Sequence, residues 1–580
     1  MPVHNADIAR AFEEIADLLD IGDANPFRIR AYRNAARIVG ELQLDISAAL
    51  ARGEDLPKLP GVGEDLSNKI REIAATGSCA LLVRLRKSFP PAITELLRIP
   101  GLGPKRVKTL YHELDVQTLE QLHRAALDQR IRALPGFGEK TEANILDAVK
   151  TRLSKAQRFK LAVAAQYADA LADHLRASRG ADKVVVAGSL RRMRETVGDI
   201  DILATSGPGG DVMDRFVRYG EVKEVLARGD TRSSVVLKSG IQVDLRVVPR
   251  ESYGAALHYF TGSKAHNIAI RRLAQDRGLK LNEYGIFKGD RRVGGDTEDS
   301  VFAAVGLPFI PPELREDHGE IEAARAGKLP RLVEVGDLKG DLHSHSKWTD
   351  GHHAIREMAL AAKAHGLAYL AITDHSRRLT VARGLDPQRL RKQMTEIDDV
   401  AVPGITLLKG IEVDILEDGS LDLPDAVLGE LDLVIAAVHS KFDLSRERQT
   451  ERILRALDHP LVSMLAHPVG RLIGAREPYD VDMLKIIRKA VARGRFLELN
   501  AHPERLDLLD THCRMAKDEG ALVAINSDAH TIQQFDNLKY GVGQARRGWL
   551  EKRDVANTRP LPELRALLAK EKPRASAKRA

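Results

Sequence analysis

Residues 186–203, VAGSLRRMRETVGDIDIL, carry a Gly-Ser turn followed by two aspartates in one apolar run. Asp199 and Asp201 alternate with isoleucines, so a β-strand directs both carboxylates to the same face. A third aspartate, Asp244, lies in a second strand-like run, Ile241–Val248. Carboxylates that lie this close repel one another unless a cation sits between them. The pattern predicts a two-ion site for Mg²⁺ or Mn²⁺ in an α+β domain.

A Gly-Ser turn ahead of an Asp-x-Asp strand is typical of nucleotidyltransferases in general and does not identify the substrate. Gly188 and Ser189 would offer a backbone amide and a hydroxyl to phosphate oxygens, and Arg192 would supply a charged fork. Gly198 directly precedes the first aspartate. The competing interpretation is a buried pair of structural aspartates, which the whole set of residues disfavours.

The segment Tyr259-Phe260-Thr261-Gly262-Ser263 resembles the nucleotide-binding segment of family X DNA polymerases. The resemblance implies that Tyr259 and Phe260 lie against the sugar and disfavour a 2′-OH. It also implies that Asn267 reaches the base edge and that Arg271 reaches the template strand. The nucleotide-binding residues expected on this basis are Gly188, Ser189, Arg192, Gly198, Tyr259, Phe260, Gly262, Asn267 and Arg271.

Residues 1 to about 150 read as short amphipathic helices and contain the sequence Pro-Gly-x-Gly three times, within Leu59–Gly63, Ile99–Gly103 and Leu134–Gly138. Each copy resembles a helix-hairpin-helix motif, in which backbone N–H groups beside a helix N-terminus bind phosphate without reading bases. The alternative is a set of structural turns between helices. The DNA-binding glycines expected here are Gly61, Gly63, Gly101, Gly103, Gly136 and Gly138.

The basic and aromatic stretch Phe27–Ala36 resembles a helix of the small amino-terminal domain of DNA polymerase beta. The resemblance assigns Arg28 and Tyr32 to the 5′-phosphate at a gap, and Lys69 to the position of a deoxyribose-phosphate lyase nucleophile. A nucleophilic lysine needs a depressed pKa, so a solvated DNA-facing lysine is an equal alternative. Asp65 stands where the family often has a phosphate-binding lysine, which counts against lyase activity.

Beyond residue 340, apolar runs alternate with helical patterns, which predicts a βα barrel. Histidines and acidic residues recur at the ends of the predicted strands, where the sites of such barrels assemble. Any one of these histidines alone would more often be an ordinary core or surface residue. The order and spacing of the full set resemble the PHP (polymerase and histidinol phosphatase) domain.

The resemblance implies three metal sites. His343, His345, Glu412 and Asp528 would hold the first; Glu412, His439 and His467 the second; Asp350, His375 and His530 the third. In this assignment Glu412 bridges two ions and, with His439, is central to hydrolysis. Mixed imidazole and carboxylate ligands suit up to three Mn²⁺, Zn²⁺ or Fe²⁺ ions and do not choose among them. The additional histidines are expected to be solvated; these are His352, His353 and His502.

The changes of pattern predict several domains in 580 residues: all-α amino-terminal domains, an α+β palm and thumb, and an α/β barrel. The expected parts are a DNA-binding and lyase-like domain at 1–80, a helix-hairpin-helix domain at 81–150, a nucleotidyltransferase palm at 151–250, a thumb at 251–318, a linker at 319–338, a PHP nuclease domain at 339–565 and a basic tail at 566–580.

The composition is that of a soluble globular protein without a signal peptide or a membrane segment. Two cysteines, Cys79 and Cys513, indicate a reducing cytoplasm and exclude a disulfide framework. A net charge of +7 is compatible with nucleic acid but weak evidence for it. We expect a monomer.

Together these features resemble a bacterial or archaeal family X DNA polymerase with a PHP domain. The resemblance implies a repair enzyme that fills short gaps in gapped or nicked DNA with deoxynucleoside triphosphates. It also implies a metal-dependent 3′–5′ exonuclease, with cleavage at abasic sites or 3′-phosphatase activity as additional options. The alternatives are a PHP domain that is a phosphomonoesterase, and a DNA-end scaffold with both centres silent.

Overall fold

The computed structural model describes residues 5–22, 24–41, 46–56, 62–89, 93–97, 99, 101–156, 158–207 and 210–569. The chain divides into two compact units, residues 1–157 and 158–580. Gly61 and most of the basic tail lie outside the described residues. Among the helices that are described, none has the length and apolar character needed to cross a membrane.

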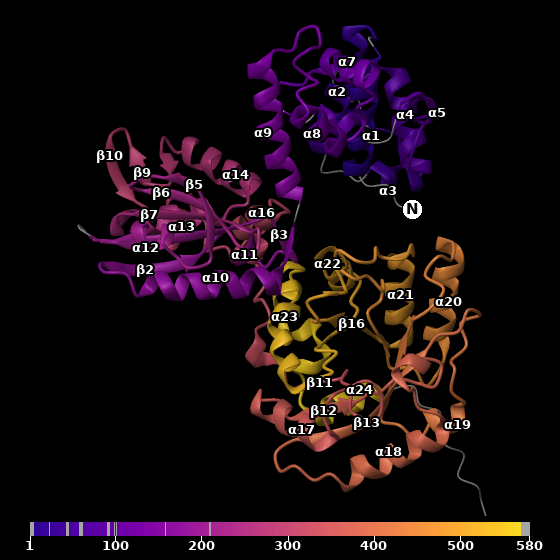
Figure 1. Cartoon of the computed structure of the whole chain (residues 1–580). Helices are drawn as coiled ribbons and strands as arrows, with labels where there is room; N and C mark the ends of the chain where they lie inside the picture. Colours follow the sequence, from indigo (N-terminus) through magenta and orange to yellow (C-terminus); the bar gives the residue numbers. More distant parts are fainter. Residues whose placement is uncertain are drawn as a thin grey trace, which may run out of the picture. The chain divides into compact units, whose positions relative to one another are not determined.

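In the part of the first unit that the structure describes, helices and the turns between them make up the fold (Figure 1). Its helices are α1 Asn5–Ile21, α2 Pro26–Glu41, α3 Ile46–Ala51, α4 Glu64–Thr76, α5 Ala80–Ser88, α6 Ile93–Leu96, α7 Pro104–Leu114, α8 Leu119–Leu127 and α9 Glu139–Ala156. One core joins them, because α1 contributes Ile8, Phe12 and Ile15 at helical spacing to a cluster that extends to Val149. The Pro-Gly-x-Gly segments end at Gly63, Gly103 and Gly138, each directly before the first residue of a helix, as predicted.

The second unit begins with the expected palm, which keeps that name below. Its strands are β1 Phe159–Lys160, β2 Ala181–Val186, β3 Thr196–Val197, β4 Asp199–Ser206, β5 Val222–Arg228, β6 Arg232–Leu237 and β7 Gln242–Val248. Its helices are α10 Leu161–Arg176, α11 Gly188–Arg191 and α12 Val212–Val217. The main sheet has the order β2-β4-β7-β6-β5, and within it only the pair β4–β7 is parallel. Figure 1 shows α10 running along this sheet.

The thumb follows as a small helical cluster with a three-stranded sheet of order β10-β9-β8. Its elements are η1 Arg250–Ser252, α13 Tyr253–Thr261, α14 Lys264–Gln275, β8 Lys280–Asn282, β9 Gly285–Lys288, β10 Arg291–Gly294, α15 Glu298–Ala304 and η2 Pro312–Leu314. The segment 319–338 carries α16 Glu320–Arg325 and η3 Val335–Asp337. Several of its apolar side chains are buried: Ile321 and Leu332 join the thumb core, and Val333 joins the barrel core.

The C-terminal domain is a nearly closed parallel barrel with seven strands in sequence order. The strands are β11 Gly340–Asp341, β12 Tyr369–Ile372, β13 Thr406–Asp414, β14 Leu433–Ala437, β15 Met464–Leu465, β16 Phe496–Asn500 and β17 Val523–Asn526. A parallel bridge between Ser344 and Ala529 joins the chain after the first strand to the chain after the last.

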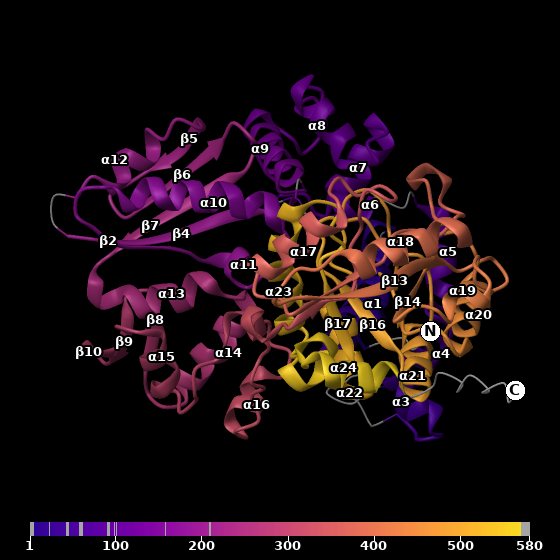
Figure 2. The same cartoon turned by 90° about the horizontal axis from the view of Figure 1, so that it is seen from below.

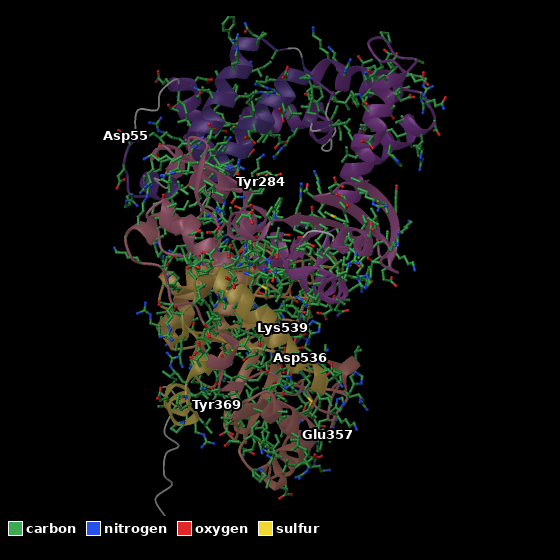
Figure 3. The ribbon with its side chains drawn as sticks, turned by 90° about the vertical axis from the view of Figure 1, so that its left-hand side faces the viewer. Asp55, Tyr284, Glu357, Tyr369, Asp536 and Lys539 are labelled. Atoms are coloured by element: carbon green, nitrogen blue, oxygen red, sulfur yellow. The ribbon has the colours of Figure 1, made fainter. Side chains whose placement is uncertain are left out.

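Helices surround these strands (Figures 1 and 2). They are α17 Ile355–Ala364, η4 Thr380–Ala382, α18 Pro387–Asp399, α19 Asp425–Leu428, α20 Arg446–Asp458, α21 Met483–Arg493, α22 Asp510–Asp518, η5 Ile532–Asn537, α23 Leu538–Arg547, η6 Lys552–Asp554, η7 Ala556–Thr558 and α24 Leu561–Leu568. Inward-facing side chains such as Tyr369, Leu408 and Phe496 fill the barrel together with Leu564 of α24. At Gly340 a side chain is excluded, because a Cβ there would lie 1.9 Å from the ring of Tyr369, labelled in Figure 3.

Every strand-like run predicted from the sequence contains a strand, and several additional strands have a physical reason for lacking a sequence pattern. β5 is exposed along almost its whole length, so it carries no alternating apolar signal. β11 and β15 contain two residues each, which is too short for any periodicity.

A packing contact inside the thumb gives the first testable prediction. A Cβ on Gly254 would lie 2.1 Å from the Thr297 carbonyl carbon, and backbone atoms cannot swing away as a side-chain end can. Gly254→Ala is therefore expected to lower the free energy of unfolding by about 1–3 kcal/mol, as overpacking does. The measurement is denaturant unfolding of the full chain. Gly220→Ala is the control, because space is open there and the backbone is not left-handed; equal stability of the two variants would contradict the prediction.

Candidate active sites

The palm carboxylates meet because β4 and β7 are parallel and in register. Asp201 lies directly opposite Asp244, and Asp199 lies two residues earlier on β4, on the same face. Asp244 is fixed by two donors from the sheet: the Ser234 hydroxyl and Gln242 Nε2, the latter at 2.9 Å. The three carboxylates that the sequence singled out are thus on neighbouring strands, as predicted from their alternation.

Burial and like charge dominate the chemistry of this site. Burial, together with the charges of Asp199 and Asp244, raises the pKa of Asp201 to about 7. Three carboxylates that repel one another and offer only oxygen ligands fit hard divalent cations such as Mg²⁺ or Mn²⁺. Gly188 makes room for this carboxylate, because a Cβ there would lie 2.1 Å from Asp201 Oδ2. Its backbone is also left-handed, with φ of 63°.

The expected nucleotide-binding segment forms the end of α13 and the start of α14. The rings of Tyr259 and Phe260 meet edge to face, with centroids 5.0 Å apart. The Arg271 guanidinium lies 4.9 Å from the centre of the Tyr259 ring, and Asn267 Nδ2 donates to the Tyr259 carbonyl oxygen at 2.7 Å. Asn267 and Arg271 therefore support Tyr259 in this structure.

Two consecutive arginines tie this segment to the Gly-Ser turn. Arg192 donates through Nε to Glu316 at 3.0 Å and through Nη1 to the Thr261 carbonyl oxygen. Arg191, which sequence patterns did not single out, donates to the Thr261 hydroxyl at 2.6 Å and to Glu298 at 2.6 and 2.9 Å. Glu298 is 107 residues away from Arg191 in the chain, so no local pattern could have paired them.

The hairpin glycines of the first unit fall into two groups. Gly101 and Gly136 have left-handed backbones with φ of 86° and 80°, which other residues adopt at a cost. Gly63, Gly103 and Gly138 have ordinary φ values, and a Cβ on any of them would meet nothing within 4 Å. The fold itself therefore does not require glycine at these three positions.

The expected 5′-phosphate residues do not form one exposed group. Arg28 is exposed, but Tyr32 is buried, and its ring lies 5.5 Å from that of Phe12. Lys69 Nζ lies 2.5 Å from Asp65 Oδ1. Burial lowers the pKa of Lys69, but the bond to Asp65 and the nearby Tyr32 outweigh it and raise that pKa. A raised pKa is the opposite of what a Schiff-base nucleophile needs.

Glu412 is the centre of the barrel site. It points inward near the end of β13, and its two oxygens face different groups of histidines. Oε1 lies 2.9 Å from His467 Nε2 and 3.2 Å from His439 Nε2. Oε2 lies 3.4 Å from His343 Nε2 and 3.7 Å from His345 Nε2. These distances would allow Glu412 to bridge the first and second expected metal sites.

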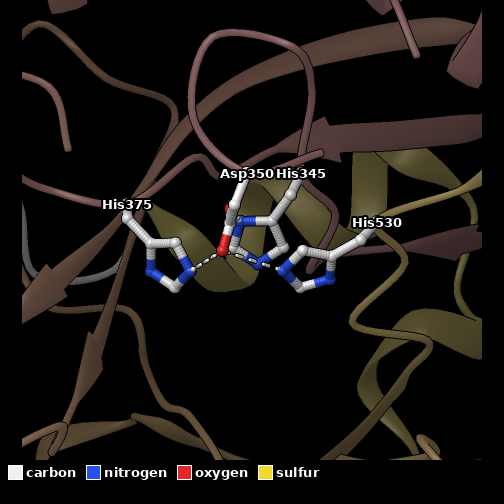
Figure 4. A group of neighbouring side chains, drawn as sticks. All are labelled: His345, Asp350, His375 and His530. Atoms are coloured by element: carbon white, nitrogen blue, oxygen red, sulfur yellow. Dashed lines mark ion pairs between the residues drawn. The ribbon is translucent and has the colours of Figure 1, made fainter. Parts of the chain in front are cut away.

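Asp528 and Asp350 complete the cluster. Asp528 Oδ1 lies 3.1 Å from His345 Nε2 and 3.5 Å from His343 Nε2. Asp350 Oδ2 lies 3.3 Å from His375 Nε2 and 3.5 Å from His530 Nε2, as drawn in Figure 4.

All nine expected ligands therefore lie in one connected site. The groupings overlap more than expected, because His345 also comes within ligand distance of the Asp350 group. The Nδ1 atom of His375 likewise lies 2.8 Å from Glu412 Oε2.

The carboxylate charge of the barrel site and its buried polar atoms without well-aligned hydrogen bonds fit the binding of metal ions. His343 Nε2 and Glu412 Oε2 are buried, and neither makes a well-aligned hydrogen bond although they lie 3.4 Å apart. Burial lowers the pKa of His375, but Glu412 and Asp350 raise it to about 10. Burial raises the pKa of Glu412, but the histidines around it hold that pKa well below its usual range. The same excess of carboxylate charge that raises the pKa of His375 favours divalent cations.

Carboxylates behind the ligands orient two of the histidines. His343 Nδ1 lies 2.7 Å from Glu498 Oε1, and His439 Nδ1 lies 2.5 Å from Asp414 Oδ1. Such partners fix the ring and the tautomer of a ligand. Sequence reasoning missed both, although Glu498 is an acidic residue at an inward position of the apolar strand β16, and Asp414 lies two residues after Glu412. Of the three histidines expected to be solvated, His352 is exposed, but His353 and His502 are half-buried, which corrects the expectation for both. Burial lowers the pKa of His502, which lies near Asp528.

Comparison with known proteins agrees with this geometry. Family profiles match a helix-hairpin-helix domain at residues 3–79, a SAM-like helix-hairpin-helix tandem at 93–151, the DNA polymerase beta thumb at 256–316 and a PHP domain at 341–502. The chain is 41% identical over 574 residues to "DNA polymerase/3′-5′ exonuclease PolX" of Bacillus subtilis (strain 168), covering 98% of this chain and 99% of that protein. The chain belongs to the family X DNA polymerases with a C-terminal PHP domain.

Two further relatives each match a part of this family X chain. DNA polymerase lambda of Rattus norvegicus is 25% identical over 344 residues, which is 54% of this chain and 56% of that protein. A probable phosphatase of Thermoanaerobacter sp. (strain X514) is 33% identical over 202 residues, which is 33% of this chain and 78% of that protein.

The raised pKa of Asp201 predicts a pH effect. Below about pH 7 this carboxyl binds a proton that a metal ion must displace, whereas above that pH it is already ionised. The Mg²⁺ concentration that gives half-maximal primer extension should therefore rise as pH falls, by up to about tenfold per unit below the pKa. Extension assays over a series of pH values and Mg²⁺ concentrations measure this. A half-maximal concentration that stays constant from roughly pH 8 to 6 would contradict it.

Proposed function

We infer that this protein is a DNA-directed DNA polymerase whose PHP barrel is a 3′–5′ exonuclease acting on the same DNA. The observation that carries the polymerase half is the register of β4 and β7, which brings Asp199, Asp201 and Asp244 together at the Gly-Ser turn. The family supplies the substrate class, namely deoxynucleoside triphosphates and DNA.

In the palm, the three aspartates would hold two Mg²⁺ or Mn²⁺ ions. When bound, such ions neutralise the triphosphate and make the primer 3′-OH more acidic. Arg192 and the amide and hydroxyl of the Gly-Ser turn bind the triphosphate oxygens, and Tyr259 and Phe260 exclude a ribose 2′-OH. The support of Tyr259 by Arg271 and Asn267 favours this role, since a steric filter has to be rigid.

In the barrel, the nine ligands would hold up to three Mn²⁺, Zn²⁺ or Fe²⁺ ions. When bound, such ions polarise a phosphodiester and make an attacking water more acidic. The two-sided position of Glu412 supports a site of at least two ions, and all nine positions carry residues able to bind metal. A second candidate is removal of a terminal phosphate, favoured by the phosphatase relatives of this domain.

DNA would be held by the first unit through the hairpin backbones. Open space at Gly63, Gly103 and Gly138 supports this role, because a close approach of another molecule explains glycines that the fold does not require. The raised pKa of Lys69 disfavours lyase activity and leaves this residue as a cationic contact. The biological role we propose is short-gap filling in DNA repair by a monomer.

Separate inactivation of the two centres is the main test of the proposed function. Asp201→Ala is expected to abolish extension of a 5′-labelled primer on gapped DNA and to leave its degradation intact, because the barrel ligands are unaffected. His439→Ala is expected to abolish Mn²⁺-stimulated degradation and to leave gap filling within about twofold of wild type, since distant sites couple weakly. One gel, run with and without nucleotides, measures both activities.

The two variants serve as controls for each other. Loss of both activities in either variant would show that the functions are not divided between palm and barrel. If His439→Ala degrades primer at the wild-type rate, the barrel is not the nuclease. Release of inorganic phosphate from a 3′-phosphorylated primer, without nucleoside monophosphate, would instead establish the phosphatase.

Backbone contacts to phosphate predict an unusual salt dependence. Gly101→Val should weaken binding to gapped DNA, because valine strains the left-handed backbone that presents the N–H groups. The slope of log affinity against log salt should hardly change, since each contact by Lys or Arg contributes about 0.9 and amides contribute little. Fluorescence anisotropy at several salt concentrations measures both quantities.

Gly53→Val is the matched control for that variant. Gly53 has a similar left-handed φ of 77° and open space, but lies outside the Pro-Gly-x-Gly segments. It should leave the affinity for DNA unchanged. Equal losses in the two variants would mean that the hairpin at Gly101 is only a structural turn.

A further inference from the structure

The turn that follows α11, residues Arg192–Glu195, is covered by the barrel. Arg547, the last residue of α23, donates through Nη1 to the Arg192 carbonyl oxygen at 2.9 Å. The Met193 side chain lies over Gly543 of α23, where a Cβ would lie 2.4 Å from Met193 Cε. Figure 2 shows α23 beside α11. The barrel thus contacts the segment that carries the expected triphosphate-binding arginine.

A chain of alternating charges runs through this contact. Arg547 donates through Nε and Nη2 to Asp510 Oδ2, at 3.0 and 2.7 Å, and through Nη1 to Glu316 Oε1 at 2.9 Å. The same Glu316 oxygen accepts from Arg192 Nε at 3.0 Å. The side chain of Arg547 is only 3% exposed, and those of Arg192 and Glu316 are 13% exposed. The charges are therefore little screened by water.

Glu316 stays ionised because of arginines from both sides. Burial raises its pKa, but Arg192 and Arg547 together lower it below the ordinary value. Glu316 therefore holds the Nε side of the Arg192 guanidinium, while the Thr261 carbonyl oxygen holds Nη1. Arg192 has a long side chain with many rotamers, and the position of Glu316 restricts that choice. Arg547 in turn fixes Glu316, because Asp510 holds the Arg547 guanidinium in place.

We propose that Arg547 of the PHP barrel is a positioning residue of the polymerase, which orients Arg192 for the nucleotide triphosphate through Glu316. This inference rests on the proposed polymerase function and on the role given to Arg192. It assigns the barrel a second task that needs none of its metal ligands. A barrel that serves only as a nuclease would not need to contact this turn of the palm.

Arg547→Gln in the full chain tests the proposal. The KM for the nucleotide in single-nucleotide gap filling should rise about tenfold, within the usual range for coupled sites. The kcat should change much less, because lost triphosphate binding affects ground state and transition state alike. Primer degradation should stay at the wild-type rate, because Arg547 is not one of the nine expected metal ligands of the barrel.

Arg546→Gln is the matched control. Arg546 is the neighbouring residue on α23 and makes a similar ion pair with the thumb, to Glu313 at 2.7 Å, but it does not reach Arg192 or Glu316. It should leave KM unchanged. A general loosening of the contact between palm and barrel would raise KM in both variants and would overturn the proposal.

A double-mutant cycle separates positioning from a merely structural role. Arg192→Gln alone should raise KM, and Arg547→Gln should add little to it if it acts through Arg192. If the two substitutions raise KM independently, so that their fold-changes multiply in the double variant, the inference would be overturned. An unchanged KM in a folded Arg547→Gln would overturn it as well, and both outcomes would leave the polymerase function standing. An unchanged KM in Arg192→Gln would instead refute the role of Arg192, and with it both statements. If Arg547→Gln lowers the thermal midpoint, Glu316→Gln, which keeps the side-chain shape, must give the same rise in KM.

Discussion

Buried carboxylate charge is the constraint on which both catalytic centres depend. An ionised carboxylate loses hydration when it is buried and must recover that free energy from neighbouring cations. In the barrel, histidines surround Glu412 and Asp528, and the pKa of each acid is held well below its usual range. In the palm, the nearest fixed charges around Asp201 include two further carboxylates, and its pKa rises. The two centres therefore differ in what surrounds their buried acids: the palm carboxylates face one another, whereas the barrel carboxylates face histidines.

Backbone geometry produces this crowding of charge. Parallel strands place their carboxyl ends at one edge, so residues far apart in the chain meet there. In the barrel, this edge receives ligands from the ends of β11, β12, β14, β15 and β17 around Glu412 of β13. In the palm, a single parallel pair within an otherwise antiparallel sheet sets Asp201 against Asp244. Glycines leave room for neighbouring side chains at two tight positions: Gly188 for Asp201 and Gly340 for Tyr369.

The sequence was sufficient to predict the metal-ligating residues that recur in a regular pattern. It was insufficient to predict the residues that hydrogen-bond to these ligands and orient them. Alternation identified β4 and its aspartates, and histidines after apolar runs identified the barrel ligands. Glu498 and Asp414 were missed because an outer carboxylate has no fixed spacing from the histidine that it orients. The half-buried Arg191 and the buried Glu298 and Arg315 form a group whose members come from three separate segments, so only the folded chain reveals it. The overlap among the barrel groups likewise depends on side-chain angles that no spacing encodes.

The palm and the barrel are more closely joined than a linker between two enzymes would require. Leu506 and Tyr540 of the barrel belong to the palm core, and Trp549 belongs to the thumb core. Separation of the domains would expose this apolar surface and would leave Glu316 with arginine partners from the palm side alone. Loss of one partner of a buried ion pair is strongly unfavourable, because the remaining charge stays partly desolvated. Hydrophobic burial thus maintains the contact, while the ion pairs through Glu316 fix the relative position of palm and barrel. The polymerase site of the palm therefore depends on contacts with the PHP barrel, although it does not use the hydrolysis reaction of that barrel.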